Sequence, residues 1–139
     1  MKTKAPVCKY TSIMLIDDND IDNFINERLV KAYYFSKNVY VHTSTRSALE
    51  FLKNIEVTMH ELPAELIPSH IMLDINMPIL DGFHFLDEFE KFAPELKKKI
   101  KIVMLTTSLN PLDVERSNKY ESVVKFIHKP LTEEELSGL

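Results

Sequence analysis

Five short apolar runs, separated by stretches with helical periodicity, constrain the fold of this chain more than any other feature. They predict strands at 12–16, 38–42, 70–74, 101–107 and 123–128. Strands that alternate with helices form parallel sheets, and strands that are apolar along their whole length are buried on both faces. The pattern therefore predicts an α/β fold in which helices cover both faces of a five-stranded parallel sheet.

The segments between these runs predict the covering helices. Apolar residues at helical spacing indicate an amphipathic helix over 20–33: Ile21, Phe24, Ile25, Leu29 and Ala32. Ser44 is placed to cap a second helix, and a third is predicted over 82–92 with Phe85, Leu86 and Phe89 facing inward.

Two more helices are marked by their capping residues. Asn110 precedes a proline at the first helical position, which is typical of a helix start. Thr132 with Glu135 three residues later forms a capping box, and Glu133 and Glu134 suit the positive end of the helix dipole.

Two segments are predicted to lie outside the alternation of strands and helices. Residues 1–11 are expected to be an N-terminal extension of a single domain that spans 1–139. Pro63 and Pro68 prevent a continuous helix across 56–69. We therefore predict an enlarged loop there, with at most one short turn of helix.

The composition narrows the classes of function. The net charge of −4 and a single basic run at 97–99 argue against nucleic-acid binding. No apolar stretch approaches the roughly 20 residues of a membrane span, and the N-terminus has no apolar secretion signal. Cys8 is the only cysteine, which excludes an internal disulfide and a multi-cysteine zinc site. We expect a cytoplasmic protein that contacts neither membrane nor nucleic acid.

The side chains that could carry out chemistry are predicted to lie where the strands end. Asp17 and Asp18 follow the first strand, Asp74 ends the third, Thr106 lies at the end of the fourth, and Lys129 follows the fifth. The carboxyl ends of parallel strands meet at one edge, which is where open α/β sheets bind ligands. The sequence therefore predicts a cluster of carboxylates, a hydroxyl and an ammonium at this edge.

These carboxylates need a positive counter-charge. Two of them about 4 Å apart repel by about 4 kcal/mol at an effective dielectric constant near 20. Lys129 supplies one positive charge, and a divalent cation would supply more. Because the available ligands are oxygens, the predicted ion is Mg²⁺.

A carboxylate beside Mg²⁺ can attack phosphorus and form an aspartyl phosphate. Asp74, in the middle of the sheet edge, is the candidate nucleophile. Asp18, with Asp17 behind it, would hold the metal. Lys129 and the Thr106 hydroxyl would then contact the phosphoryl oxygens.

The sequence resembles the response-regulator receiver domain of two-component signalling over about residues 12–136. The resemblance is carried by four motifs in order: "LIDDND" (15–20), "IMLDINMPILDG" (71–82), "VMLTTS" (103–108) and "FIHKPLT" (126–132). It implies a flavodoxin-like doubly wound sheet with strand order 2-1-3-4-5. It also implies a phosphorylation-dependent switch that catalyses only its own phosphorylation and dephosphorylation.

The resemblance also implies roles for individual residues. Asp74 would be the phosphoacceptor, and Asp17, Asp18, Asp74 and the backbone carbonyl of Asn76 would arrange Mg²⁺. Thr106 and Phe126 would form the switch, with Lys129 binding the phosphoryl group. Asn76 and Ser108 would tune the lifetime of the phosphate, and the Lys129–Pro130 peptide would be cis.

Partners follow from the same resemblance. A sensor histidine kinase or a histidine phosphotransfer protein would supply the phosphoryl group. The signal would leave through the face formed by the fourth helix, fifth strand and fifth helix, toward a protein target that the sequence does not name. The segment "LTTSLNPLDVERSNKY" is similar to stand-alone receivers, some of which form homodimers through this face.

The chain departs from the receiver pattern in three places. The loop at 56–69 is longer than usual, which leaves room for a specific contact. The segment 119–124, "KYESVV", replaces a small Ala-Gly-like stretch. The final helix is short, so either it is trimmed or a natural chain continues beyond Leu139.

Three other readings fit parts of the pattern. A phosphatase of the haloacid-dehalogenase type needs a second aspartate two residues after the nucleophile, where this chain has Asn76. A receiver-like module that is never phosphorylated would not need the full set of site residues. A flavin binder needs a phosphate-binding loop, and Gly82 and Gly138 are the only glycines.

Overall fold

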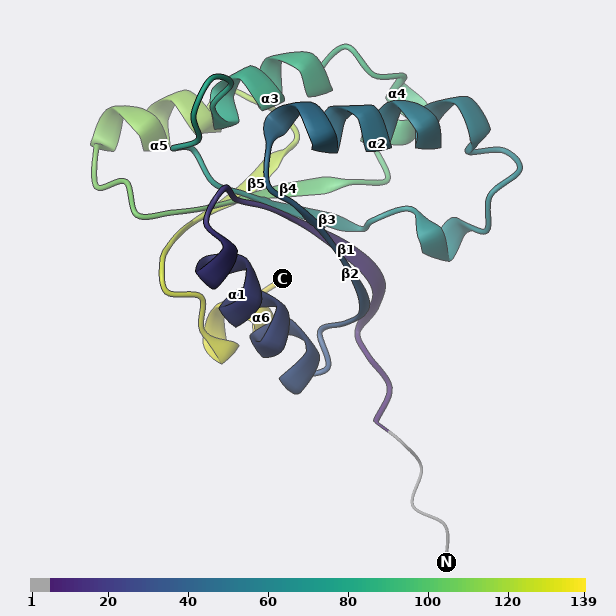
Figure 1. Cartoon of the computed structure of the whole chain (residues 1–139), viewed down its shortest axis with the longest axis horizontal. Helices are drawn as coiled ribbons and strands as arrows, with labels where there is room; N and C mark the ends of the chain where they lie inside the picture. Colours follow the sequence, from purple (N-terminus) through teal and green to yellow (C-terminus); the bar gives the residue numbers. More distant parts are fainter. Residues whose placement is uncertain (1–5) are drawn as a thin grey trace, which may run out of the picture.

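A five-stranded parallel sheet forms the centre of the molecule, in the computed structural model that describes residues 6–139. The strands are β1 (Tyr10–Ile16), β2 (Ser36–His42), β3 (His70–Leu73), β4 (Lys101–Thr106) and β5 (Val123–His128). Their order across the sheet is β2-β1-β3-β4-β5. The predicted fold class and strand order are confirmed (Figure 1).

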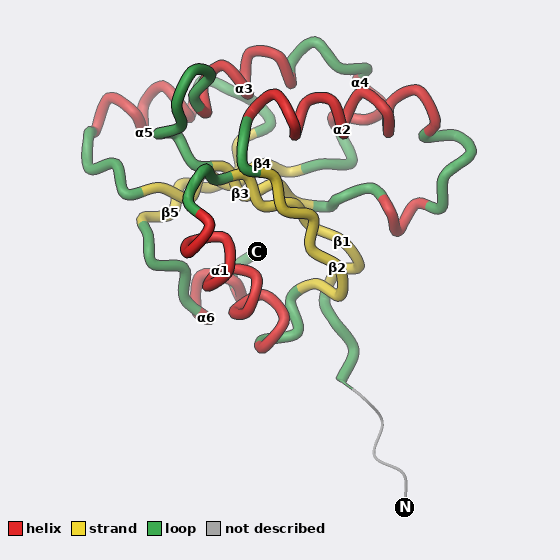
Figure 2. The backbone as a smooth tube through the Cα atoms, viewed as in Figure 1, coloured by secondary structure: helices red, strands yellow, loops and turns green. Residues whose placement is uncertain are grey.

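Helices cover both faces of this sheet (Figure 2). One face carries α1 (Asp20–Ala32) and α6 (Glu133–Ser137); the other carries α2 (Thr45–Thr58), α3 (Gly82–Phe89), α5 (Pro111–Asn118) and the short α4 (Pro94–Lys97). Their N-caps include all three predicted ones, because Ser44, Asn110 and Thr132 each accept a backbone N–H through the side chain.

The sheet divides the apolar interior into two clusters. Met14 and Ile16 of β1 belong to the cluster beneath α2 and α3, whereas Ile13 and Leu15 belong to the one beneath α1 and α6. This alternation is that of a strand whose two faces are both covered. The inward positions predicted for α3 are confirmed, because Phe85, Leu86 and Phe89 are fully buried.

Helix α1 turns a different face to the sheet from the one predicted. Its buried residues are Asn23, Asn26 and Val30, while Ile21 and Phe24 are 69% and 59% exposed. The Asn23 side-chain amide donates a hydrogen bond of 2.8 Å to the backbone oxygen of Asp17. This buried bond fixes the rotation of α1, so a polar contact overrides the apolar periodicity from which the face was predicted.

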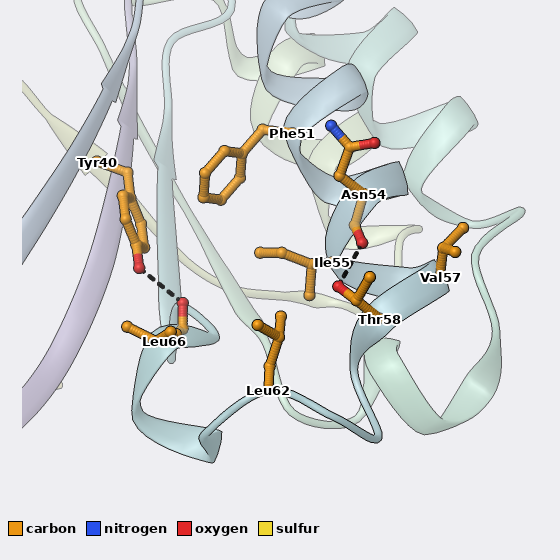
Figure 3. Close-up of a pocket in the computed structure, with 8 residues that line it drawn as sticks. All are labelled: Tyr40, Phe51, Asn54, Ile55, Val57, Thr58, Leu62 and Leu66. Carbon is orange, nitrogen blue, oxygen red and sulfur yellow. Dashed lines mark hydrogen bonds between the residues drawn. The ribbon is translucent and has the colours of Figure 1, made fainter.

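The segment 56–69 is the predicted loop with one short helical turn, except at its start. Helix α2 continues to Thr58, and a short 3₁₀ helix spans Ala64–Leu66, between the two prolines. With β2 and α2 the segment encloses a pocket of about 510 Å³, lined by apolar side chains that include Phe51 and Leu62 (Figure 3). Tyr40 holds the segment through a hydrogen bond of 2.8 Å from its hydroxyl to the Leu66 carbonyl.

Several element boundaries also differ from those predicted. Strand β1 begins at Tyr10, inside the predicted extension 1–11, of which the first five residues lie outside the described part of the chain. Helix α3 ends at Phe89 rather than at 92, and α4 follows it as an additional turn with Pro94 at its start. Across residues 6–139 no helix is long and apolar enough to cross a membrane.

The segment 119–124 packs through its aromatic residue. Tyr120 stacks on Phe83, with ring centroids 6.5 Å apart, and donates a hydrogen bond of 2.6 Å to Asp87. Arg116 lies over the other aromatic ring of this group, 4.0 Å from the Phe83 centroid. The unusual segment therefore ties α5 to α3.

We predict that His70 makes the folding stability depend on pH. Burial, with a smaller contribution from the charges of Lys101 and Lys9, lowers the pKa of His70 to about 4. In the unfolded chain His70 binds a proton near the ordinary pKa of about 6.5. The neutral buried imidazole therefore contributes its full share of folding stability above pH 6.5, and this share is lost as the pH falls toward 4. Protonation of His70 should lower the free energy of unfolding by about 2 kcal/mol between pH 7 and pH 5.

Urea unfolding at the two pH values measures this dependence. His70→Gln should have a shallower dependence than wild type, whereas His60→Gln, at a position where the side chain is 73% exposed, should keep the wild-type slope. Equal slopes for wild type and His70→Gln would show that the buried imidazole does not control the acid sensitivity.

Candidate functional site

Three aspartates meet at the carboxyl edge of the sheet. Asp17 follows β1 and Asp74 follows β3, and both are buried, whereas the neighbouring Asp18 is exposed. One carboxylate oxygen from each residue lies within 4.8 Å of the others. The strand ends therefore bring together the carboxylates that the sequence predicts.

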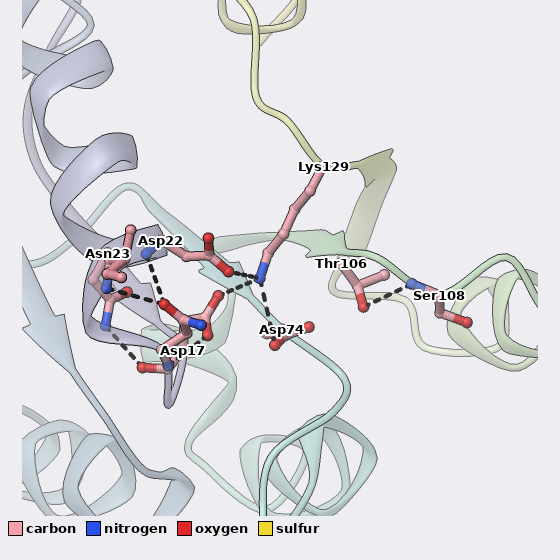
Figure 4. Close-up of polar contacts among 9 residues, drawn as sticks. Asp17, Asp22, Asn23, Asp74, Thr106, Ser108 and Lys129 are labelled. Atoms are coloured by element: carbon pink, nitrogen blue, oxygen red, sulfur yellow. Dashed lines mark hydrogen bonds and ion pairs between the residues drawn. The ribbon is translucent and has the colours of Figure 1, made fainter.

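The ammonium group of Lys129 reaches into this cluster from the loop between β5 and α6 (Figure 4). Its Nζ lies 2.5 Å from Asp17 Oδ2, 2.8 Å from Asp22 Oδ2 and 3.6 Å from Asp74 Oδ2. The first two contacts are hydrogen bonds, and the third is an ion pair beyond hydrogen-bonding distance.

One lysine does not neutralise the site. Burial alone would lower the pKa of Lys129, but its hydrogen bonds to Asp17 and Asp22 and the charge of Asp74 raise it above the usual range. Burial raises the pKa of Asp17, and so does the charge of Asp74, although the hydrogen bonds from Lys129 and Asn19 oppose this. The buried carboxylates thus carry more negative charge than the ammonium offsets.

A divalent cation fits this surplus of negative charge. Asp74 Oδ1 is buried and, among the described residues, has no hydrogen-bond partner. An unpaired buried oxygen is unfavourable unless a ligand or water completes it. The donor set of carboxylate oxygens is the one that Mg²⁺ prefers. Asp17, Asp18 and Asp74 are therefore suited to hold this ion.

The start of α1 fixes the carboxylates that follow β1. The backbone N–H of Asn19 donates to Asp17 Oδ1 at 2.9 Å, and the Asn19 side chain accepts from the N–H groups of Ile21 and Asp22. Together with the bond from Asn23 to the Asp17 carbonyl, these contacts orient both the carboxylate and the first turn of the helix.

The loop after β3 is closed by Gly82. A Cβ atom added at this position would lie 2.5 Å from the Asp74 carbonyl oxygen, so any other residue would displace the backbone at the site. The Gly82 N–H donates a bond of 2.9 Å to the Ile75 carbonyl. Asn76, between Asp74 and Gly82 in the chain, is exposed, with its side chain accessible to a ligand.

The end of β4 forms the other side of the site. Thr106 is fully buried, and its hydroxyl accepts a bond of 3.3 Å from the Ser108 N–H. The Thr106 carbonyl accepts a bond of 2.9 Å from the Lys129 N–H, which links the two strand ends. Ser108 donates through its hydroxyl to Asp113 on α5, so the loop after β4 is tied to that helix.

Phe126 lies on β5, three residues before Lys129. It is opposite Met104 in the register of β4 and β5, is half-buried, and packs against the cluster beneath α2 and α3. Its ring stands 5.4 Å from that of His128. The Lys129–Pro130 peptide bond beyond the strand is cis.

Asp22 was not predicted as a site residue. It lies in the first turn of α1, where an acidic residue is explained by the helix dipole alone. Its position in the first helical turn after β1, close in sequence to Asp17 and Asp18, was the one available signal.

The doubly wound sheet with an acidic cluster and a lysine at its carboxyl edge defines the class of protein. The family model of the response regulator receiver domain matches residues 13–138. The chain belongs to this family, and it is therefore a phosphorylation-dependent switch of two-component signalling. This assignment decides against the phosphatase and the flavin binder.

Individual relatives agree with the family. The chain is 27% identical to the probable methanogenesis regulatory protein FilR2 of Methanothrix harundinacea, over 89% of this chain and 75% of the relative. The crystal structure of a two-component response regulator from Cytophaga hutchinsonii has a TM-score of 0.82 and 30% identity, covering 94% of this chain and 93% of that one. The Mn²⁺-bound form of the response regulator Rcp1, a protein of Synechocystis, has a TM-score of 0.70 and 26% identity, over 92% and 88% of the two chains.

We predict that Mg²⁺ stabilises this protein against unfolding. An ion that binds only the folded state adds about 2.7 kcal/mol of stability at a concentration 100 times its Kd, which raises the Tm by several degrees. Asp18→Asn should lose most of this increase, because one ligand of the cluster is gone. Thermal unfolding with and without Mg²⁺ measures the effect.

Asp20→Asn is the matched control, since it removes the same charge from an exposed position two residues farther along. It should keep the wild-type increase in Tm. An equal increase in both variants would show that the ion binds through general attraction to negative charge rather than at the cluster.

Proposed function

We propose that Asp74 accepts the phosphoryl group and that Lys129 and Thr106 assist the transfer. The observation that supports this most strongly is the position of the Asp74 carboxylate. It is buried at the end of the central strand, 3.6 Å from the Lys129 ammonium, and has one oxygen without a hydrogen-bond partner among residues 6–139. The Asp74 carboxylate is thus shielded and oriented, and one of its oxygens is available to attack phosphorus.

In the proposed step an Asp74 oxygen forms a bond to phosphorus while the bond between phosphorus and the donor histidine nitrogen breaks. The electron pair of the broken bond stays on the imidazole. Such transfers need positioning and neutralisation of the negative charge on the equatorial oxygens. Lys129 and the Thr106 hydroxyl each contact one of these oxygens, and bound Mg²⁺ supplies the remaining positive charge.

Hydrolysis by water in the same site reverses the modification, so the domain catalyses both its phosphorylation and its dephosphorylation. Asn76 and Ser108 are proposed to set the rate of hydrolysis. Asn76 is exposed shortly after Asp74, and Ser108 contacts the Thr106 hydroxyl through its backbone N–H. The Asn76 backbone carbonyl is proposed as a further ligand of Mg²⁺, beside Asp17, Asp18 and Asp74. Rcp1, which has the same fold, has a Mn²⁺-bound form.

Receiver domains take their phosphoryl group from histidine kinases, and for this chain we propose a sensor histidine kinase or a histidine phosphotransfer protein as donor. We further propose a stand-alone regulator that acts on a protein partner without contacting nucleic acid. Its cytoplasmic location stays a prediction.

The signal is proposed to leave through the face formed by α5, β5 and α6, which are the fourth and fifth helices of the receiver pattern and the strand between them. A phosphoryl group adds a charge of about −1.5 to −2, which draws the Thr106 hydroxyl toward it. Because Phe126 packs on the same side of the sheet as Met104 of β4, space vacated near Thr106 is open to its ring. Two arrangements of this aromatic side chain would then give two states of the face.

The same face is proposed to carry a homodimer. Leu112 of α5 and Val124 of β5 are 66% and 52% exposed, and Leu109 before α5 is 85% exposed. Sedimentation velocity with and without beryllofluoride, an analogue of the phosphoryl group, distinguishes monomer from dimer.

We predict that Mg²⁺ with acetyl phosphate adds one phosphoryl group to the wild-type protein and none to Asp74→Asn. The amide cannot act as the nucleophile, although it keeps the shape of the side chain. Intact mass before and after incubation measures the modification.

Asp20→Asn should be modified like wild type. Modification of Asp74→Asn to the wild-type extent would place the phosphoacceptor elsewhere. No modification of the wild type by acetyl phosphate or by histidine-phosphorylated donors would instead indicate a module that works without phosphate.

We predict that Phe126→Ala uncouples the signalling face from the site. In the wild type, beryllofluoride should change the amide NMR signals of α5, β5 and α6. In Phe126→Ala these changes should stay confined to the loops around Asp74, because no ring follows Thr106.

Phe51→Ala is the control, since it removes another partly buried ring from the same apolar cluster on α2. Changes that reach α5 and β5 in Phe126→Ala as they do in wild type would contradict the aromatic route.

A further inference from the structure

We propose that Asp22 is a positioning residue that competes with the phosphoryl group for the Lys129 ammonium. It would hold the ammonium on the α1 side of the site before transfer, and so limit the stability of the phosphorylated state. This inference rests on the proposed function of Asp74 and Lys129.

The geometry shows the ammonium already engaged. A lysine has three N–H donors. Two of them are directed to Asp17 and Asp22, at 2.5 and 2.8 Å, while Asp74 lies 3.6 Å away. In Figure 4 the Lys129 side chain passes between Asp22 and Asp74, with its end on the side of α1. A phosphoryl oxygen on Asp74 can bind the third N–H, and the closer approach that this bond needs draws the ammonium away from the α1 side.

The two hydrogen bonds are not equally easy to exchange. The Asp17 side chain is 6% exposed and the Asp22 side chain 34% exposed. Water can replace the ammonium at the more exposed carboxylate, so this contact is the weaker one. Asp17 is also a proposed metal ligand, which leaves Asp22 as the partner that Lys129 can give up.

Asp22 is held in place independently of Lys129. Its backbone N–H donates to the Asn19 side chain, within the capped first turn of α1. The Asn23 bond to the Asp17 carbonyl fixes the rotation of the same helix. The backbone that carries Asp22 is therefore fixed near the ammonium without any contribution from Lys129.

A purely structural explanation is that Asp22 only complements the dipole of α1. Asp20 separates the two explanations, because it belongs to the same turn and is acidic and exposed. Within residues 6–139 it forms no ion pair with Lys129, whose partners are Asp17, Asp22 and Asp74. Both aspartates complement the dipole, but only Asp22 contacts the ammonium.

The test is the affinity for beryllofluoride at saturating Mg²⁺, measured by fluorine NMR on the full chain. Asp22→Asn should lower the Kd about fivefold, which is about 1 kcal/mol at 1.4 kcal/mol for each factor of ten. Asp22→Glu keeps the competing charge and should stay within about twofold of wild type, as should Asp20→Asn, whose charge is screened by solvent.

A second readout reports on the contact itself. The heteronuclear NMR signal of the Lys129 ammonium, recorded without beryllofluoride, should show faster hydrogen exchange in Asp22→Asn and unchanged exchange in Asp20→Asn. The free energy of unfolding, measured with urea, should fall to a similar extent in these two variants, since both lose one charge from the helix start.

The outcomes separate this inference from the function on which it rests. Tighter binding in Asp22→Asn alone supports it. Equal affinities in wild type and all variants, a similar gain in Asp20→Asn, or weaker binding in Asp22→Asn would each overturn it while leaving the role of Asp74 intact. Failure of the wild type to bind beryllofluoride would overturn the proposed function and this inference together.

Discussion

The contact between one ammonium group and several buried carboxylates is the constraint on which the site depends. Lys129 comes from the last loop of the domain, whereas Asp17 and Asp74 follow β1 and β3, and all three meet only when the sheet is assembled. Like charges about 4 Å apart repel by about 4 kcal/mol at an effective dielectric constant near 20. The lysine therefore makes it possible for the edge to hold its aspartates, and its incomplete compensation leaves the site ready for a cation.

The same contact satisfies the cluster only in part, so that the site can bind a ligand. If every carboxylate oxygen of the cluster had a hydrogen-bond partner, none would be free to bind a ligand. Asp74 Oδ1, however, is without a hydrogen-bond partner in the described part of the chain. The ammonium is close to this residue without donating to it, at 3.6 Å. The apolar clusters on both sides of the sheet provide the stability with which the fold tolerates this arrangement.

Much of the fold and the positions of the site residues could be predicted, because strand ends depend on simple patterns. Apolar runs mark the strands, and parallel strands deliver Asp17, Asp74 and Lys129 to one edge. The buried face of α1 could not be predicted, since it depends on the bond from Asn23 to a backbone carbonyl that only the folded chain presents. Asp22 was missed for a related reason: acidic residues are common in a first helical turn, and its contact with the ammonium spans most of the chain.

The glycine that opens α3 has a mechanical consequence. Because Gly82 approaches the Asp74 carbonyl too closely for a Cβ atom, the start of α3 and Asp74 are in direct backbone contact. Two backbone segments in such close contact cannot shift independently, so α3 and the end of β3 are expected to move together. Tyr120 and Arg116 fasten the α5 side of the domain to α3 through Asp87 and Phe83. A shift of α5 relative to α3 would therefore have to break or rearrange two contacts, one from Arg116 on α5 itself and one from Tyr120 in the segment that follows it.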